Sequence, residues 1–230
     1  IQVNYLGQAS TIGAPYIDYI LVDQHLVPPA SQQDYTEKVV YLPDTYLVCD
    51  SKRPISSQMF TRTELGLPET GFVFCCFNNN YKIAPFIFDI WMRVLQQVHD
   101  SVLWLIEGHP TACQNLRDEA LKRGVSSERL VFAPKVGSSV HLARHRHADL
   151  FLDTLPVNAH TTTSDALWAG LPVLTCMGQT FASRVAGSLI SAVGLPELIT
   201  DTLEDYEAMA LKLATSPVLL ASIKHKLQQQ

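Results

Sequence analysis

Four polar side chains in a row precede an apolar pattern with helical spacing. They are His160, Thr161, Thr162 and Thr163, within the string VNAHTTTSDALWAGLPVLT. The first turn of a helix exposes backbone N–H groups that have no acceptor inside the helix, and the positive end of the helix dipole lies there. Added hydroxyl groups supply further donors, so this pattern predicts a site for a phosphate or another anion.

The same residues allow a simpler interpretation. Thr162 and Asp165 have the spacing of a helix-capping box, which stabilises a helix by about 1 kcal/mol and needs no ligand. Four consecutive polar residues exceed what a cap requires, and this favours ligand binding.

Lys82 is a second candidate, because it follows a strand-like run and a flexible ammonium group can neutralise phosphate charge. An ordinary solvated lysine is the alternative. His141 and Arg144 lie three residues apart, so both could reach a base or ribose from one helix face. His141, His145 and His147 also allow a zinc site, but no third ligand stands at a telling spacing, and surface histidines are the simpler account.

The elements that must position these residues alternate from about residue 70 onward. Short apolar runs at 72–77, 102–107, 129–133, 149–153 and 173–176 read as strands. Longer amphipathic runs lie between them, helical periodicity is clear at 84–98, and two more helices are expected at about 202–214 and 217–228. This predicts an α/β fold, a Rossmann-like parallel sheet with flanking helices. No GxGxxG string is present, so a dinucleotide is not proposed.

The polar loops of this fold gather at one edge. Loops rich in Asn, Lys, His, Thr and Ser follow the strands that end near 77, 133, 153 and 176. Ligands of open parallel sheets bind outside the carboxyl ends of the strands, so we expect the chemistry at this edge.

The first 50 residues read differently, as strand-like pieces at 1–7, 16–23, 38–43 and 45–50 with little helical periodicity. We therefore divide the chain into a first unit at 1–50, a linker at 51–69 and the Rossmann-like unit at 70–230. Pro and Ser in the stretch 51–60 mark the linker.

Composition excludes several classes of protein. The net charge of −5, with no cluster of Lys and Arg, argues against a nucleic-acid surface. No apolar run is long enough to span a bilayer, so no membrane partner is expected. Five scattered cysteines form neither a disulfide framework nor a CxxC pair, which suits a reducing cytoplasm.

Several strings of the sequence together resemble one enzyme family. VNAHTTTSDALWAGLPVLT, FNNNYKIAP, ADLFLDT and ASRVAGSL, with the opening YLG and the later YTEKVVYLP, are similar to the carboxyl-terminal catalytic region of O-linked N-acetylglucosamine transferases of bacterial type. The resemblance implies an inverting glycosyltransferase of the GT-B type that moves N-acetylglucosamine from UDP-GlcNAc to Ser or Thr hydroxyls of proteins. Residues 1–50 would then be the end of the first catalytic half, and 70–230 the donor-binding half.

The resemblance also assigns roles by position. Lys82 would contact the diphosphate as the catalytic residue, with Asn79 beside it where the family commonly has Gln. His160, Thr161 and Thr162 would cradle the phosphates and the sugar, and Asp165 would accept hydrogen bonds from the ribose. The expected contacts with the base and sugar come from His141, Arg144, the backbone of Val136, and Leu6 with Gly7.

The resemblance implies further partners, and this chain departs from the animal relatives at two places. It implies a tetratricopeptide superhelix and the first catalytic half in the same full-length chain, and no metal or other cofactor. Ser138 stands where animal relatives have a lysine, and the 51–70 joint lacks their long insertion. Two alternatives stay open: a UDP-sugar-binding module without catalysis, and a related transferase with a non-protein acceptor.

Overall fold

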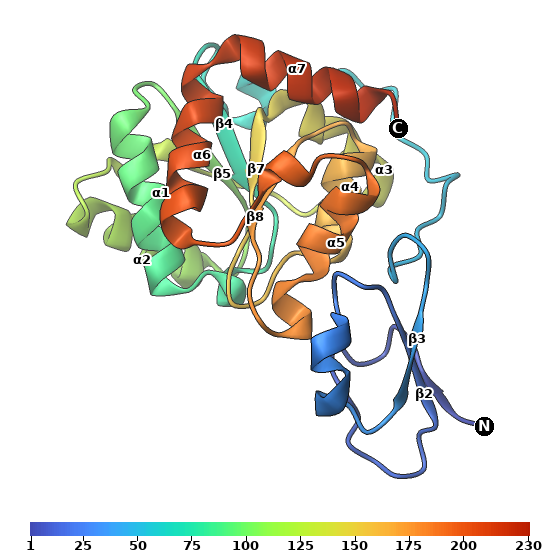
Figure 1. The fold of residues 1–230 in the computed structure, drawn as a ribbon. Helices are drawn as coiled ribbons and strands as arrows, with labels where there is room; N and C mark the ends of the chain where they lie inside the picture. Colours follow the sequence, from blue (N-terminus) through green and yellow to red (C-terminus); the bar gives the residue numbers. More distant parts are fainter.

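The computed structural model describes all residues from 1 to 230, and these form a small amino-terminal unit attached to a larger α/β unit (Figure 1). The strands are β1 (Val3–Asn4), β2 (Tyr19–Val22), β3 (Lys38–Tyr41), β4 (Val73–Cys76), β5 (Val102–Ile106), β6 (Leu130–Ala133), β7 (Leu150–Leu152), β8 (Val173–Cys176) and β9 (Ile199–Thr200). The α-helices are α1 (Pro85–Gln97), α2 (Pro110–Lys122), α3 (Ser138–Arg144), α4 (Thr161–Trp168), α5 (Val185–Ala192), α6 (Leu203–Thr215) and α7 (Pro217–Gln228). None of the helices combines the length and apolar composition needed to cross a bilayer.

The larger unit is built on a parallel sheet with the strand order β6-β5-β4-β7-β8-β9. The five strands predicted from the apolar runs are all present, and β9 is an addition. With two residues, β9 is too short to show a periodicity of its own. Because β4 pairs with β5 on one side and β7 on the other, the direction of strand succession reverses between β4 and β7.

Helices cover both faces of this sheet. The helices α1 and α6 pack together on one face, whereas α3, α4 and α5 follow one another on the other (Figure 1). Every residue of β4, β7 and β8 is buried, which is the burial pattern of a parallel strand covered from both sides. The apolar stripe predicted for 84–98 is the buried face of α1, where Ile87, Trp91 and Val94 have no exposed surface.

The small unit contains a parallel sheet in the order β1-β2-β3. The prediction of a further strand at 45–50 is wrong. After β3 the chain leaves the sheet, and the backbone N–H of Tyr46 bonds to the carboxylate of Asp23 at 2.9 Å instead of to a strand. The β-rich sequence of Thr45–Asp50 packs against α4 and α5 through side-chain contacts of Thr45 and Cys49.

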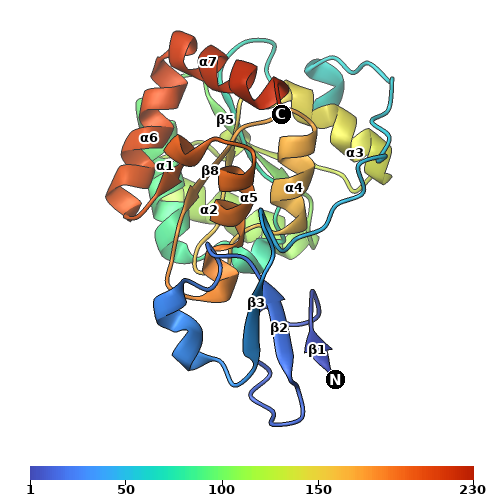
Figure 2. The ribbon, with the colours of Figure 1, turned by 45° about the vertical axis from the view of Figure 1, so that its right-hand side comes forward.

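The chain then runs along the outside of the larger unit from 42 to 72, beside α4 and α3, before it enters β4 (Figure 2). Its contacts mark the route. The N–H of Ser56 donates to the carbonyl of Ser139 in α3 at 3.0 Å, and Arg62 forms an ion pair with Asp149 at 3.4 Å. The predicted linker is therefore fastened to the larger unit along its length.

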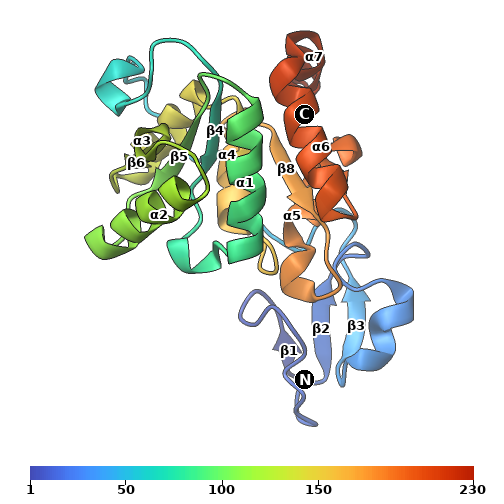
Figure 3. The same cartoon turned by 90° about the vertical axis from the view of Figure 1, so that its left-hand side faces the viewer.

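The two units meet at the buried carboxylate of Asp23, which is 1% exposed. It accepts hydrogen bonds from the backbone N–H groups of His25 and Leu26, from the N–H of Tyr46, and from the hydroxyl of Ser188 in α5 at 2.7 Å. Arg184, just before α5, also donates to the carbonyl of His25. Strand β8 runs toward the small unit, so the carboxyl ends of the sheet strands face this junction (Figure 3).

We expect Asp23→Ala to lower the free energy of unfolding by about 3 kcal/mol or more, because several buried donors lose their acceptor at once. Urea denaturation measures this quantity. Asp34→Ala is the matched control, since the Asp34 carboxylate is exposed and accepts no hydrogen bond. Equal stability of the two variants would contradict this account of the junction.

Candidate functional site

The site lies where the strand order reverses between β4 and β7, a position at which open α/β sheets bind ligands. The loops that follow these two strands are joined by a buried amide. The side chain of Asn78 donates to the hydroxyl of Thr154 at 2.9 Å, and the hydroxyl of Thr162 donates to Asn78 at 2.5 Å. One side chain therefore fixes the end of β4 against both the loop after β7 and the start of α4.

Lys82 lies where these loops meet, at the end of the short helical turn Asn80–Lys82, and we refer to this junction of the loops after β4 and β7 as the crevice. Its ammonium donates to the backbone carbonyl of the buried Asn158 at 2.8 Å. The structure thus brings Lys82 to the loop that leads directly into α4, 76 residues away in the chain. Asn79 is exposed, and its carbonyl accepts the N–H of Lys82 at 2.9 Å.

The start of α4 presents free donors at the same place. The helix begins at Thr161, and the side chain of His160 before it makes no capping hydrogen bond. The backbone N–H groups of Thr161, Thr162 and Thr163 donate to no acceptor in the protein. Three unpaired N–H groups and the positive end of the helix dipole form an anion-binding arrangement.

The capping-box interpretation of Thr162 and Asp165 is wrong. The hydroxyl of Thr162 donates to Asn78, and the carboxylate of Asp165 forms an ion pair with Arg53. Both side chains have partners on other segments, so neither satisfies the helix start. The hydroxyl of Thr163 donates to the carbonyl of Ala159 at 3.1 Å, whereas Thr161 is exposed.

The loop before α4 is shaped by a carboxyl group that the sequence analysis missed. Asp153 is 1% exposed and accepts hydrogen bonds from the N–H groups of Thr154 and Ala159 and from the hydroxyl of Thr175, each at 2.7 Å. Burial raises the pKa of Asp153 to about 7, and these hydrogen bonds and the charge of Lys82 act in the opposite direction. The sequence did contain a signal for Asp153, because it follows directly after the apolar run of a predicted strand, at the end of the string ADLFLD.

His160 borders the crevice as a neutral side chain. Burial lowers the pKa of His160, the contact with the carbonyl of Ala182 raises it, and the charge of Lys82 lowers it further. Its Nε2 atom lies 3.4 Å from that carbonyl. The imidazole is therefore unprotonated at neutral pH and adds no positive charge beside Lys82.

His141 and Arg144 form a second group, around the ring of Phe77. The His141 and Phe77 rings are 5.1 Å apart, and the guanidinium carbon of Arg144 lies 4.8 Å from the Phe77 ring centre. Arg144 is 2% exposed and donates to the carbonyl of Pro134 at 2.6 Å and to His141. Its guanidinium therefore holds the surroundings of His141 in place.

A pocket of about 300 Å³ opens beside this group. Its walls come from Val136, Val140 and Arg144 on one side and from the segment that contains Phe60 and Leu65 on the other. Val136 is 43% exposed. The linker segment thus completes a pocket next to residues to which the resemblance assigns the base.

The structure does not support either a zinc site or surface positions for all three histidines. No group of three His, Cys, Asp or Glu side chains is arranged to bind a metal ion, so nothing favours the zinc site considered for His141, His145 and His147. His145 is not a surface residue, because it has no exposed surface and its Nδ1 atom donates to the carbonyl of His141 at 2.8 Å. In the sequence, a buried histidine such as His145 cannot be distinguished from the exposed polar residues of the same short helix.

The remaining predicted residues lie apart from Lys82. Asp165 is one turn after Thr161 on α4, and its carboxylate is bound by Arg53, which sequence reasoning assigned to a linker. Leu6 and Gly7 lie after β1 in the small unit, both exposed, and no hydrogen bond joins them to the crevice. Leu6 has a positive φ of 61°, a conformation that strains a non-glycine residue and often marks functional loops.

The buried His145 generates a pH dependence of stability. Burial lowers the pKa of His145 to about 4, from an ordinary value of 6.5. Its folded pKa lies below the unfolded one, so its stabilising contribution is complete above pH 6.5 and is lost as the pH falls toward 4. We expect the unfolding free energy of the wild type to fall by up to about 1.4 kcal/mol per pH unit through this group.

The variant His145→Asn tests this, because an Asn amide can replace the Nδ1–H donor and does not titrate. Urea unfolding between pH 7 and 4.5 should show a shallower fall for His145→Asn than for the wild type. The exposed His225→Asn should follow the wild type. Parallel curves for all three proteins would show that His145 does not titrate as described.

Comparison with known proteins identifies the family. The model of glycosyl transferase family 41 matches residues 1–60 and 51–230. A probable UDP-N-acetylglucosamine–peptide N-acetylglucosaminyltransferase SEC of Arabidopsis thaliana is 38% identical over 99% of this chain. The UDP-N-acetylglucosamine–peptide N-acetylglucosaminyltransferase of Caenorhabditis elegans is 37% identical over 75% of it. The chain spans only 24% and 15% of the lengths of these relatives.

Solved structures agree on the fold. A mutant of Thermobaculum terrenum O-GlcNAc transferase superposes with a TM-score of 0.88 at 34% identity, over 100% of this chain and 43% of that one. WaaG, a glycosyltransferase involved in lipopolysaccharide biosynthesis, gives a TM-score of 0.65 at 18% identity, over 96% of this chain and 60% of that one, and shows the fold alone. The predicted Rossmann-like fold of GT-B type is confirmed, and the chain belongs to glycosyl transferase family 41.

Proposed function

We propose that this chain forms the donor-binding part of an inverting transferase that moves N-acetylglucosamine from UDP-GlcNAc to Ser or Thr hydroxyls of proteins. Two relatives that match most of the chain are named as UDP-N-acetylglucosamine–peptide transferases, which supports both donor and acceptor. The observation that carries the proposal is the contact of the Lys82 ammonium with the carbonyl of Asn158, beside the three unpaired N–H groups of α4.

This geometry suits a leaving diphosphate. In an inverting transfer the acceptor oxygen forms a bond to the anomeric carbon while the bond from that carbon to the UDP oxygen breaks. The acceptor hydroxyl loses its proton, and the bond electrons leave with UDP as negative charge on the diphosphate. Lys82 and the N–H groups of Thr161 and Thr162 would stabilise that charge without reorganisation, and we therefore propose that no divalent metal is required.

Other parts of the donor have candidate positions nearby. The pocket beside Val136 and Arg144 is of a size that accommodates a pyrimidine base, and Asp165 offers a carboxylate for the ribose hydroxyls. His160 is neutral and borders the crevice, which suits a contact with the sugar or phosphates. We assign no residue as the proton acceptor for the incoming hydroxyl. His160 does not suit this role well, because it lies near the position proposed for the phosphates.

The wider setting of the enzyme is also proposed. These relatives are about four to five times as long as this chain, which leaves room for a first catalytic half and a tetratricopeptide superhelix in the same full-length protein. Five free cysteines, four of them buried, suit the reducing cytoplasm that we propose as its location.

Replacing Lys82 by Ala should lower the transfer rate by about 10²–10³-fold, the usual effect of deleting one preorganised donor to a developing negative charge. The measurement is the initial rate of GlcNAc transfer by the full-length protein. Lys212→Ala on the exposed surface of α6 is the control and should retain the wild-type rate. Undiminished transfer by Lys82→Ala would remove Lys82 from the mechanism.

The acceptor is tested by mass spectrometry of Ser- and Thr-containing peptides after incubation with the enzyme and UDP-GlcNAc. We expect peptides to gain one N-acetylhexosamine. Donor turnover with unmodified peptides would point to a non-protein acceptor. Calorimetric binding of UDP with neither transfer nor donor hydrolysis would indicate a binding module without catalysis.

A further inference from the structure

The segment between the two units carries an arginine that is directed entirely at α4. One terminal nitrogen of Arg53 forms an ion pair with Asp165, and the other donates to the hydroxyl of Ser164 at 3.1 Å. The guanidinium carbon lies 5.5 Å from the centre of the Trp168 ring, and the indole N–H of Trp168 donates to the carbonyl of Arg53 at 3.3 Å. Backbone and side chain of one residue thus contact three residues of one helix.

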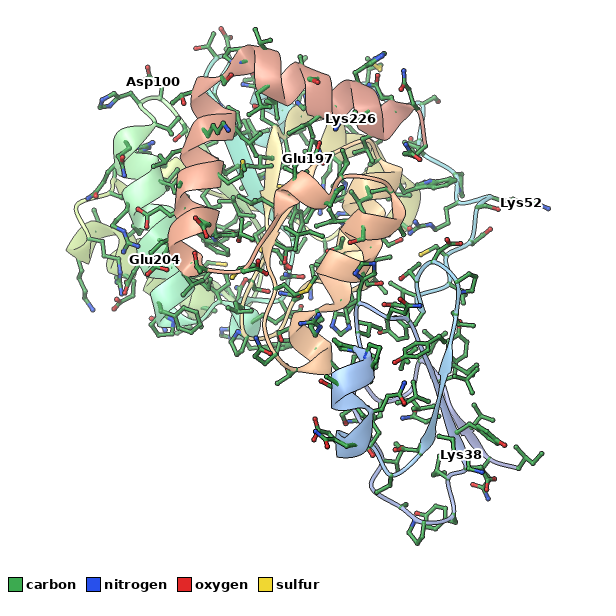
Figure 4. All side chains as sticks on the ribbon, in the orientation of Figure 1. Lys38, Lys52, Asp100, Glu197, Glu204 and Lys226 are labelled. Carbon is green, nitrogen blue, oxygen red and sulfur yellow. The ribbon has the colours of Figure 1, made fainter.

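This arrangement is specific to Arg53 within its segment. The neighbouring Lys52 is exposed and points away from the protein, without a side-chain partner (Figure 4). The Arg53 side chain is only 21% exposed, and that of Asp165 24%. An ion pair this sheltered from water is screened less than a surface pair, so it can hold a geometry.

The contact leaves part of Asp165 free. Only its Oδ1 atom is engaged by Arg53, and Oδ2 accepts no hydrogen bond from the protein. Asp165 follows Thr161 by four residues on α4, so the two side chains lie on the same face of the helix. The free oxygen therefore shares a helix face with the start of α4, to which the proposed function assigns the diphosphate.

Charge balance gives Arg53 a second effect. Burial raises the pKa of Asp165, and the charge and hydrogen bond of Arg53 act against that rise and favour the ionised carboxylate. An ionised carboxylate accepts hydrogen bonds from two vicinal hydroxyl groups, whereas an unpaired negative charge about one turn from a diphosphate would repel it. The Arg53 guanidinium allows the carboxylate to stay ionised without repelling the diphosphate, because it neutralises the negative charge and leaves Oδ2 unoccupied.

We propose that Arg53 is a positioning residue of the donor site: it orients the Asp165 carboxylate toward the vicinal hydroxyls of the donor's ribose and balances its charge next to the diphosphate. This inference rests on the proposed function, since it needs UDP at the start of α4. Through Arg53, the linker segment would contribute to the recognition of the two vicinal hydroxyls of the ribose.

The test compares the calorimetric affinity of the full-length protein for UDP with that for 2′,3′-dideoxy-UDP, which lacks the vicinal hydroxyls. The wild type should prefer UDP. Arg53→Met should weaken UDP binding by about tenfold more than dideoxy-UDP binding, the loss typical of one charged hydrogen bond. Dideoxy-UDP binding should also weaken, because the uncompensated charge of Asp165 repels either diphosphate. Arg53→Lys keeps the charge without the planar fork and should restore an intermediate preference.

Two further variants separate positioning from a structural effect. Lys52→Met removes a neighbouring charge that contacts nothing, and it should leave both affinities unchanged. Asp165→Asn should reduce the preference for UDP as Arg53→Met does, and combining the two should add little, because both changes act on the same contact. If Arg53→Met fails to fold, Arg53→Lys and Asp165→Asn still give the comparison.

The outcomes distinguish the two proposals. Equal weakening of UDP and dideoxy-UDP by Arg53→Met, or additive effects of Arg53→Met and Asp165→Asn, would overturn the role of Arg53 while the donor site stands. Absence of UDP binding by the folded wild type would refute the proposed function and this inference with it.

Discussion

The site depends on one buried polar connection, the network that ties the loop after β4 to the loop after β7. Asn78 joins Thr154 and Thr162, and Asp153 holds the N–H groups of Thr154 and Ala159. Buried amide and carboxyl groups are costly unless every partner is in place, so the network admits few alternative geometries. That rigidity brings the Lys82 ammonium to the carbonyl of Asn158, immediately before the free N–H groups of α4.

The remainder of the molecule positions this network from outside. The parallel sheet aims the ends of β4 and β7 at the same crevice, and Asp23 fixes the small unit against α5 at the same edge. The segment from 42 to 72 returns the chain to the beginning of β4 and contacts α4 and α3 on the way (Figure 2). The same segment also forms one side of the pocket beside Val136, because its residues Phe60 and Leu65 line that pocket.

Much of the fold could be predicted from the sequence because buried parallel strands are continuous apolar runs and amphipathic helices separate them. The meeting of Lys82 with the start of α4 followed from the rule that such strands present their carboxyl ends at one edge. The partners that decide finer geometry could not be predicted. Arg53 lies in the stretch predicted as a linker, and its role depends on where this irregular segment passes α4. His145 read as a surface histidine, because burial of one ring in a short helix leaves no periodic signal.

A crystal structure of the chain with bound UDP tests the central claim most directly. The account predicts the diphosphate within hydrogen-bonding distance of the Lys82 ammonium and of the backbone N–H groups of Thr161 and Thr162. A nucleotide bound elsewhere, or a diphosphate that contacts only one of these two elements, would contradict it.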